Sequence, residues 1–179
     1  MKTRILMLLA IFIFAISCNK DSDVSTIEKD VLTLEKSQTV TKHLSFKKSW
    51  GTYLVTYGEN ECFPEYAQSI VEGQGNATHL GRFTVRNEYC VDFEGTPASP
   101  IFGWLTHANG KDVIYTMVED PANDTYIGPD GLQYLEYIII GGEGRFEGAE
   151  GDILMYGTLT PETQFSGTWY LEGEGTITY

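Results

Sequence analysis

The chain has 179 residues, of which 42% are hydrophobic, and a net charge of −13 from 12 Lys and Arg against 25 Asp and Glu. This length allows one domain with a sizeable core. The acidic excess argues against nucleic acid and anionic lipid surfaces as partners, because both need a cationic face.

Residues 1–17 have the features of a secretory leader. Lys2 and Arg4 precede a run of twelve apolar residues, 5–16. As a helix this run spans about 18 Å, too short for the roughly 30 Å hydrocarbon core of a bilayer. The sequence therefore predicts a signal peptide rather than a transmembrane anchor. Its removal leaves 10 basic against 25 acidic residues, a net charge of −15.

The leader ends in Ala15-Ile16-Ser17-Cys18, which resembles a bacterial lipobox. In that motif the Cys is acylated and becomes the N-terminus, so Cys18 is the expected lipidation site and the membrane an expected partner. The alternative is an ordinary signal peptide in which Cys18 is incidental. Residues 18–43, which are polar and charged, are expected to form a flexible tether between the lipid and a domain at 44–179.

The residues after Cys18 bear on localisation. Asn19 is not the Asp associated with retention in the inner membrane, so an outer-membrane lipoprotein of the cell envelope is expected. Lys20-Asp21 with Asp23 resembles a short signal for cell-surface exposure, although a charged tether explains the same residues.

The body of the chain reads as β-structure. The clearest period of two runs through 81–94, and Asn109-Gly110 between apolar runs is a strong hairpin signal. The predicted strands are 46–57, 68–72, 81–94, 101–107, 112–119, 134–140, 152–159 and 165–178. We therefore predict an all-β fold, a single antiparallel eight-stranded barrel, with a two-sheet sandwich as the alternative.

The barrel interior is predicted to be apolar, aromatic and mostly filled. An eight-stranded barrel is just wide enough to be filled by its own side chains or to hold one small ligand. The predicted inward set is Phe83, Val85, Tyr89, Val91, Phe93, Tyr115, Met117, Leu135, Tyr137, Ile139, Met155, Trp169 and Leu171. If a pocket exists, we expect it at one barrel end, rimmed by Trp50, Trp104 or Tyr side chains. It would take a small apolar or aromatic ligand, for which the candidate residues are Trp50, Trp104, Tyr115, Tyr137 and Trp169.

Two glycine-rich stretches, 73–84 and 141–149, share a Gly-Arg-Phe core and are expected to form corners between strands. Their structural residues are Gly75, His79, Gly81, Arg82 and Phe83 in the first stretch and Gly144, Arg145 and Phe146 in the second. The paired arginines favour a duplicated structural ion pair, and a clamp for a substrate carboxylate is the alternative.

The two glycine-rich stretches, with a third short motif, resemble those of a known protein family. Gly73–Thr84 with its Gly-x-Gly-x-Ala-Thr-His-Leu-Gly-Arg-Phe-Thr motif, Ala108-Asn109-Gly110 and Gly141–Gly151 resemble a family of small secreted bacterial proteins. The resemblance covers residues 44–179. It implies a barrel similar to the allene oxide cyclase and dirigent barrels of the calycin-like group, and it carries over fold rather than activity.

The remaining cysteines predict a disulfide. With Cys18 acylated, Cys62 and Cys90 are an even pair in an oxidising compartment. The alternative is two unpaired thiols.

No metal site or cofactor is expected. His79 and His107 lie beside turns and lack a third ligand partner, so they are interpreted as turn residues. Asp120, Asp124 and Asp130 lie in an oxygen-rich loop that is a weak calcium candidate, with a solvated loop as the alternative.

The sequence is compatible with three candidate functions. The favoured one is a non-catalytic envelope lipoprotein whose barrel binds a molecule or displays loops. The alternatives are an isomerase or cyclase acting on a small apolar substrate inside the barrel, and a structural envelope component. A titratable group buried in an open lumen would favour the enzyme.

Overall fold

The computed structural model describes residues 39–179. The leader, Cys18 and most of the expected tether lie outside these residues. Nine strands and two short helices make up the described part: β1 Thr41–Thr56, β2 Ala67–Ala77, β3 Gly81–Val91, β4 Ile101–His107, β5 Val113–Val118, α1 Pro121–Asp124, β6 Thr125–Ile127, β7 Gln133–Glu143, the 3-10 helix η1 Gly144–Phe146, β8 Glu150–Pro161 and β9 Ser166–Thr178. Within them no helix is long and apolar enough to cross a membrane.

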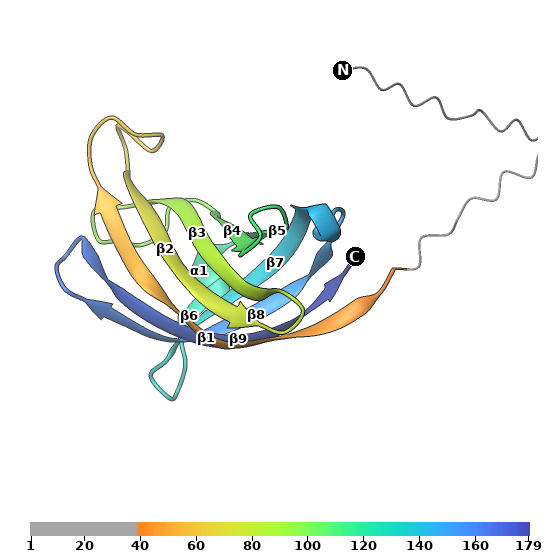
Figure 1. Ribbon diagram of the computed structural model, residues 1–179. Coiled ribbons are helices and arrows are strands. Elements are labelled where there is room, and N and C mark those ends of the chain that lie inside the picture. Colours follow the sequence, from red (N-terminus) through yellow and green to blue (C-terminus); the bar gives the residue numbers. More distant parts are fainter. Residues whose placement is uncertain (1–38) are drawn as a thin grey trace, which may run out of the picture. The chain divides into compact units, whose positions relative to one another are not determined.

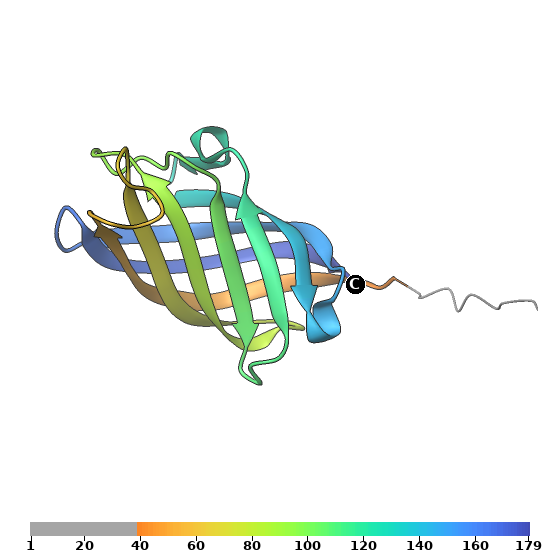
Figure 2. The same cartoon turned by 90° about the horizontal axis from the view of Figure 1, so that it is seen from above.

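The strands form one closed antiparallel barrel (Figure 1). Strands β1 to β5 pair in sequence order, as do β7 to β9, and the pairings β1–β9 and β5–β7 complete the ring. Figure 2 shows β2 to β5 running side by side along one wall. The short β6 pairs with residues 133–135 of β7, which precede the part of β7 that pairs with β5. The predicted eight-stranded barrel is confirmed, because β6 is an extra segment outside the ring of eight.

The first glycine-rich stretch is β-strand through Ala77 and forms its corner only at residues 78–80. Strand β2 continues through Gly73 and Gly75 to Ala77, well beyond the predicted end at residue 72. A Cβ at Gly73 would collide with the Trp169 ring, and one at Gly75 with the Phe83 ring. These glycines make room for aromatic side chains inside the barrel. The actual corner follows them at His79, which has a φ of +61°.

Strand β1 begins at Thr41, so the expected domain boundary at residue 44 falls inside a strand. A β-bulge interrupts its pairing between Phe46 and Ser49. Leu44 and Phe46 face inward before the bulge, and Ser49 faces inward after it. One extra residue therefore reverses the alternation and turns Trp50 outward, where 47% of it is exposed.

One end of the barrel is closed by its own side chains. Leu44, Leu80, Phe146 and Ile177 are fully buried there, and the ring of Tyr179 packs edge-on against Phe146 at 5.2 Å. The second glycine-rich stretch forms this end as predicted, since Gly144 and Gly148 adopt positive φ around η1.

Arg145 stabilises the closed end of the barrel through three contacts. Its Nε lies 3.3 Å from Asp112 Oδ2, a terminal nitrogen donates to the Leu80 carbonyl at 3.3 Å, and the guanidinium lies 4.7 Å from the Phe146 ring centre. The predicted ion pair is thus present at Arg145. Arg82 makes no ion pair within residues 39–179, so the predicted duplication is wrong.

The predicted disulfide is confirmed. Cys62, in the loop between β1 and β2, is bonded to Cys90 on β3, with 5.5 Å between their Cα atoms. The bond ties this loop to the barrel wall at the end opposite Arg145.

Candidate functional site

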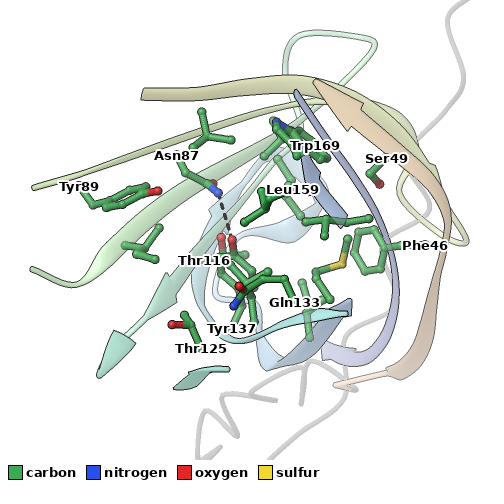
Figure 3. A pocket seen from close by; sticks show the side chains of 18 of the residues that line it. Phe46, Ser49, Asn87, Tyr89, Thr116, Thr125, Gln133, Tyr137, Leu159 and Trp169 are labelled. Carbon is green, nitrogen blue, oxygen red and sulfur yellow. Dashed lines mark hydrogen bonds between the residues drawn. The ribbon is translucent and has the colours of Figure 1, made fainter. Parts of the chain in front are cut away.

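A cavity of about 240 Å³ occupies the barrel interior (Figure 3). It lies towards the end opposite Phe146, because its lining includes Gly95 and Pro97 of the β3–β4 loop and Thr125 and Gln133 beside β6. The expectation of a mostly filled interior is therefore wrong. Leu44, Leu80, Phe146 and Ile177 fill the closed end, and the space over the β2 glycines is taken by the rings of Trp169 and Phe83.

Part of the predicted inward set lines this cavity. Tyr137 and Trp169 do so, and they are joined by Phe83, Val85, Tyr89, Leu135, Met155 and Leu171. The indole N–H of Trp169 donates to the Thr52 carbonyl at 3.3 Å, which fixes the ring against the wall.

Three residues of that set do not face inward. On β5 the buried side chains are Ile114, Thr116 and Val118, so Tyr115 and Met117 have the opposite orientation. The pattern was ambiguous because both faces of β5 are largely apolar. Phe93 lies beyond the end of β3 and is 67% exposed, with its ring stacked on Tyr57 at 5.8 Å.

The expected rim of Trp50 and Trp104 is not formed. Trp50 faces outward after the β1 bulge. Trp104 and Tyr115 lie together on the outer wall, in a groove that also contains Arg86. The hydroxyl of Tyr115 donates there to Glu143. The ligand candidates thus divide between two faces, and only Tyr137 and Trp169 belong to the lumen.

The polar groups of the cavity gather over Gly103. Asn87 on β3 pairs with Gly103 on β4, which pairs in turn with Thr116 on β5. Since Gly103 has no side chain, Asn87 Oδ1 and Thr116 Oγ1 both lie over its backbone. The Asn87 amide also donates to the Tyr137 hydroxyl at 3.1 Å, as drawn in Figure 3.

The tyrosines of the lumen are neutral. Burial is the main cause that raises the pKa of Tyr137, and the nearby Tyr89 adds to it. Burial likewise raises the pKa of Tyr89, against a smaller opposing effect of the Ser69 hydroxyl. Both phenols therefore keep their protons at neutral pH and act as hydrogen-bond donors. The other polar lining residues are Ser, Thr, Asn, Gln and Trp, so the cavity wall carries no formal charge.

Ser49 is a separate polar point in the same cavity. Its side chain is 1% exposed, and its hydroxyl has no hydrogen-bond partner within residues 39–179. It lies over Gly75, where a Cβ would meet the Ser49 oxygen. Sequence reasoning missed Ser49 because the bulge is not visible in the pattern of β1.

Thr116 was also missed, and Asn87 was not singled out. Asn87 carried a usable signal, namely a polar residue at an inward position of an apolar strand, whereas Thr116 lay on the face of 112–119 that was predicted to point outward. Asn87 lies between Val85 and Tyr89 on the inward face of 81–94, and Thr116 lies between Ile114 and Val118.

The weak calcium candidates are not brought together. Asp120 caps α1 by accepting from the Ala122 amide, and Asp124 accepts from the Asp120 amide. Asp130 accepts from the Leu132 amide and the Tyr134 hydroxyl. No three metal-ligating side chains converge in the part of the chain that the structure describes. His79 lies in the turn between β2 and β3, and His107 ends β4, where its ring accepts from the Asn109 amide at 3.1 Å.

Fold and site together define an antiparallel eight-stranded β-barrel with an uncharged, mainly apolar lumen. No protein-family model and no curated protein matches the sequence. Among solved structures, the pterocarpan synthase dirigent protein GePTS1 is similar, with a TM-score of 0.51, 12% identity, and coverage of 79% of this chain and 86% of that chain. The pterocarpan synthase dirigent protein PsPTS1 has a TM-score of 0.45 and 9% identity, with coverage of 80% of this chain and 96% of that chain. At 12% identity the likeness to GePTS1 shows a dirigent-like barrel, which is a statement about fold alone.

Proposed function

We propose that the protein is an outer-membrane lipoprotein, anchored through Cys18, whose barrel binds a small uncharged and largely apolar molecule without converting it. The cavity is the observation that carries this proposal. The leader and the lipobox-like residues 15–18 support the anchor.

The cavity dimensions limit the ligand. A volume of about 240 Å³ exceeds the roughly 150 Å³ of an engineered cavity that binds benzene, and it is below the roughly 300–1,000 Å³ typical of drug-sized ligands. A molecule of one or two rings fits this range. The uncharged wall selects against ions, because an unpaired charge in such a lumen loses its hydration without compensation.

Trp169 allows a direct test. It lines the cavity, whereas Trp50 and Trp104, the other tryptophans of the three in the chain, lie outside it. With both outer tryptophans replaced by Phe, fluorescence titration with aromatics, sterols and fatty acids reports on the lumen. We expect saturable micromolar binding by at least one member of the panel.

The matched control is Trp169→Phe in the otherwise unchanged protein. This variant should lose the response, because its two remaining tryptophans face outward. A flat response of Trp169 across the whole panel would contradict a binding function.

The second candidate is an isomerase or cyclase, and Tyr137 favours it. This phenol is a titratable group buried in the lumen and paired with Asn87. Its raised pKa makes it a poor general base at neutral pH, but a neutral O–H can stabilise an oxyanion that develops on a substrate. Mass spectrometry of bound probes decides between the two functions. Recovery of unchanged probe supports binding, and a product that Tyr137→Phe no longer forms supports the enzyme.

A further inference from the structure

Two separate points of the lumen offer hydrogen bonds that the protein leaves unused. The first is the Ser49 hydroxyl, which is buried and has no partner within residues 39–179. A buried hydroxyl without a partner is costly, and such groups in native structures call for an explanation. A ligand group that bonds to Ser49 supplies one.

The second point is the Tyr137 hydroxyl. Its oxygen accepts a hydrogen bond from the Asn87 amide at 3.1 Å, which leaves the phenolic hydrogen to be donated. Among the described residues no protein acceptor takes that hydrogen. The hydroxyl of Thr116 lies beside Asn87 over Gly103 and adds further polar surface.

The two points are well separated. Ser49 pairs with Gly75, and Gly75 pairs with Phe83, so Ser49 shares a cross-strand row with Phe83. Asn87 follows Phe83 by four residues on β3, which is roughly 13 Å along a strand. Figure 3 likewise shows Ser49 well apart from the Asn87–Tyr137 pair. The lining of the same cavity includes Met155, Trp169 and Leu171, all apolar or aromatic.

We propose that the lumen binds an elongated, uncharged molecule with a carbonyl oxygen that accepts from Tyr137 and a second hydrogen-bonding group that reaches Ser49. An apolar ring body fills the space between the two groups. This inference rests on the proposed binding function and adds the chemistry of the ligand. In it Tyr137 and Ser49 are specificity-determining residues, each matched to one polar group.

Three probes of one shape test the assignment: cyclohexylbenzene, 4-phenylcyclohexanone and 4-(4-hydroxyphenyl)cyclohexanone. Affinities are measured by calorimetry on the full-length protein in lipid nanodiscs, with empty nanodiscs as the blank. We expect Tyr137→Phe to weaken both ketones about three- to tenfold and to leave cyclohexylbenzene within about twofold. Ser49→Ala should weaken only the hydroxyphenyl ketone, by a similar factor.

Tyr89→Phe is the matched control, since it removes another phenol, a partly buried one, from the same lumen. It should leave the difference between ketone and hydrocarbon unchanged. Equal losses for all three probes in Tyr137→Phe would overturn the proposal, because a hydrogen bond to the carbonyl predicts a selective loss.

A measurement on the unaltered protein guards against a variant that does not fold. The infrared carbonyl stretch of bound 4-phenylcyclohexanone should lie below its value in hexane, because donation from a phenol weakens the C=O bond. A hexane-like stretch would overturn the Tyr137 assignment. If cyclohexylbenzene and both ketones all fail to bind while another apolar ligand binds, this inference fails alone. If no ligand of the fluorescence panel binds either, the proposed function fails with it.

Discussion

The indole of Trp169 lies so close to the backbone of Gly73 that any β-carbon at residue 73 would overlap the ring. The same position is crowded from the β1 side by the Trp50 carbonyl. Strand β2 therefore has a glycine where the neighbouring barrel wall and an interior aromatic ring meet. The glycine density that marks this stretch in the sequence is a packing requirement of the lumen.

Gly73→Ala is expected to destabilise the barrel and to displace Trp169. Overpacking of a well-packed site costs about 1–3 kcal/mol, and the Trp169 ring lines the cavity, into which it can move. Urea unfolding and the emission maximum of Trp169 measure the two effects. Gln74→Ala is the control, because Gln74 is exposed on the same strand. Equal stability of the Gly73 and Gln74 variants would refute the packing role.

Loss of the Cys62–Cys90 bond should lower the free energy of unfolding by about 3–4 kcal/mol. The bond closes a loop with a sequence separation of 28, and without it the unfolded chain gains conformational entropy. Thermal unfolding with and without dithiothreitol measures this difference. The Cys62→Ser/Cys90→Ser protein should match the reduced wild type and show no response to the reductant. An unfolding midpoint that reduction leaves unchanged would mean that the bond contributes no net stability.

Asp112 is expected to make stability dependent on acid pH. Donation from the Asn109 side chain is the main cause that lowers the pKa of Asp112, and the Arg145 backbone and charge contribute further. Because the folded-state pKa lies below the unfolded value of about 4, this contribution is present above pH 4. It is lost as the pH falls through the folded-state pKa.

The measurement compares wild type and Asp112→Asn by urea unfolding between pH 7 and pH 2. The two proteins should differ in stability at pH 7 and converge at the acid end. Glu147→Gln, which alters an exposed acid next to η1, should follow wild type throughout. A gap that stays constant over the whole range would show that Asp112 acts through packing rather than charge.

Tyr137 is expected to have the opposite effect at alkaline pH. Its pKa is raised in the folded protein because burial disfavours the phenolate. The stabilising contribution is present below the unfolded-state pKa of about 10 and is lost as the pH rises above that value. Tyr137→Phe should therefore lose less stability than wild type between pH 9 and pH 11. Tyr66→Phe, at an exposed position, serves as control. If the wild type, Tyr137→Phe and Tyr66→Phe all lose stability equally with rising pH, a buried, neutral Tyr137 is contradicted.

Acylation at Cys18 is expected to be the membrane anchor. Growth with an alkyne fatty acid should label the wild-type protein, and Cys18→Ser should abolish the label. Cys62→Ser should keep the label, since Cys62 belongs to the disulfide. Labelling that persists in Cys18→Ser would exclude this residue as the lipidation site.

The sequence by itself determined the strand class, and it favoured the closed antiparallel ring over a sandwich and the Cys62–Cys90 pair over free thiols. These features depend on local patterns: a period of two, turn residues such as Asn109-Gly110, and an even number of cysteines left for pairing. It also predicted that Tyr137 and Trp169 face the lumen, because the residues next to each of them alternate regularly between the two faces. The expected leader and Cys18 lie outside the described residues and stay predictions.

Only the tertiary structure decided which side chains meet in the cavity. A single bulge in β1 turns Trp50 outward and Ser49 inward, and the sequence of that strand contains no signal that predicts it. Tyr115 and Trp104 face the outer groove because the phase of a strand with two apolar faces is set by its neighbours. Gly73 and Gly75 on β2 and Gly103 on β4 let the side chains of Trp169, Phe83, Asn87 and Thr116 lie against the wall around the cavity. Free volume of this kind depends on the packing between strands far apart in the sequence, which local patterns do not encode.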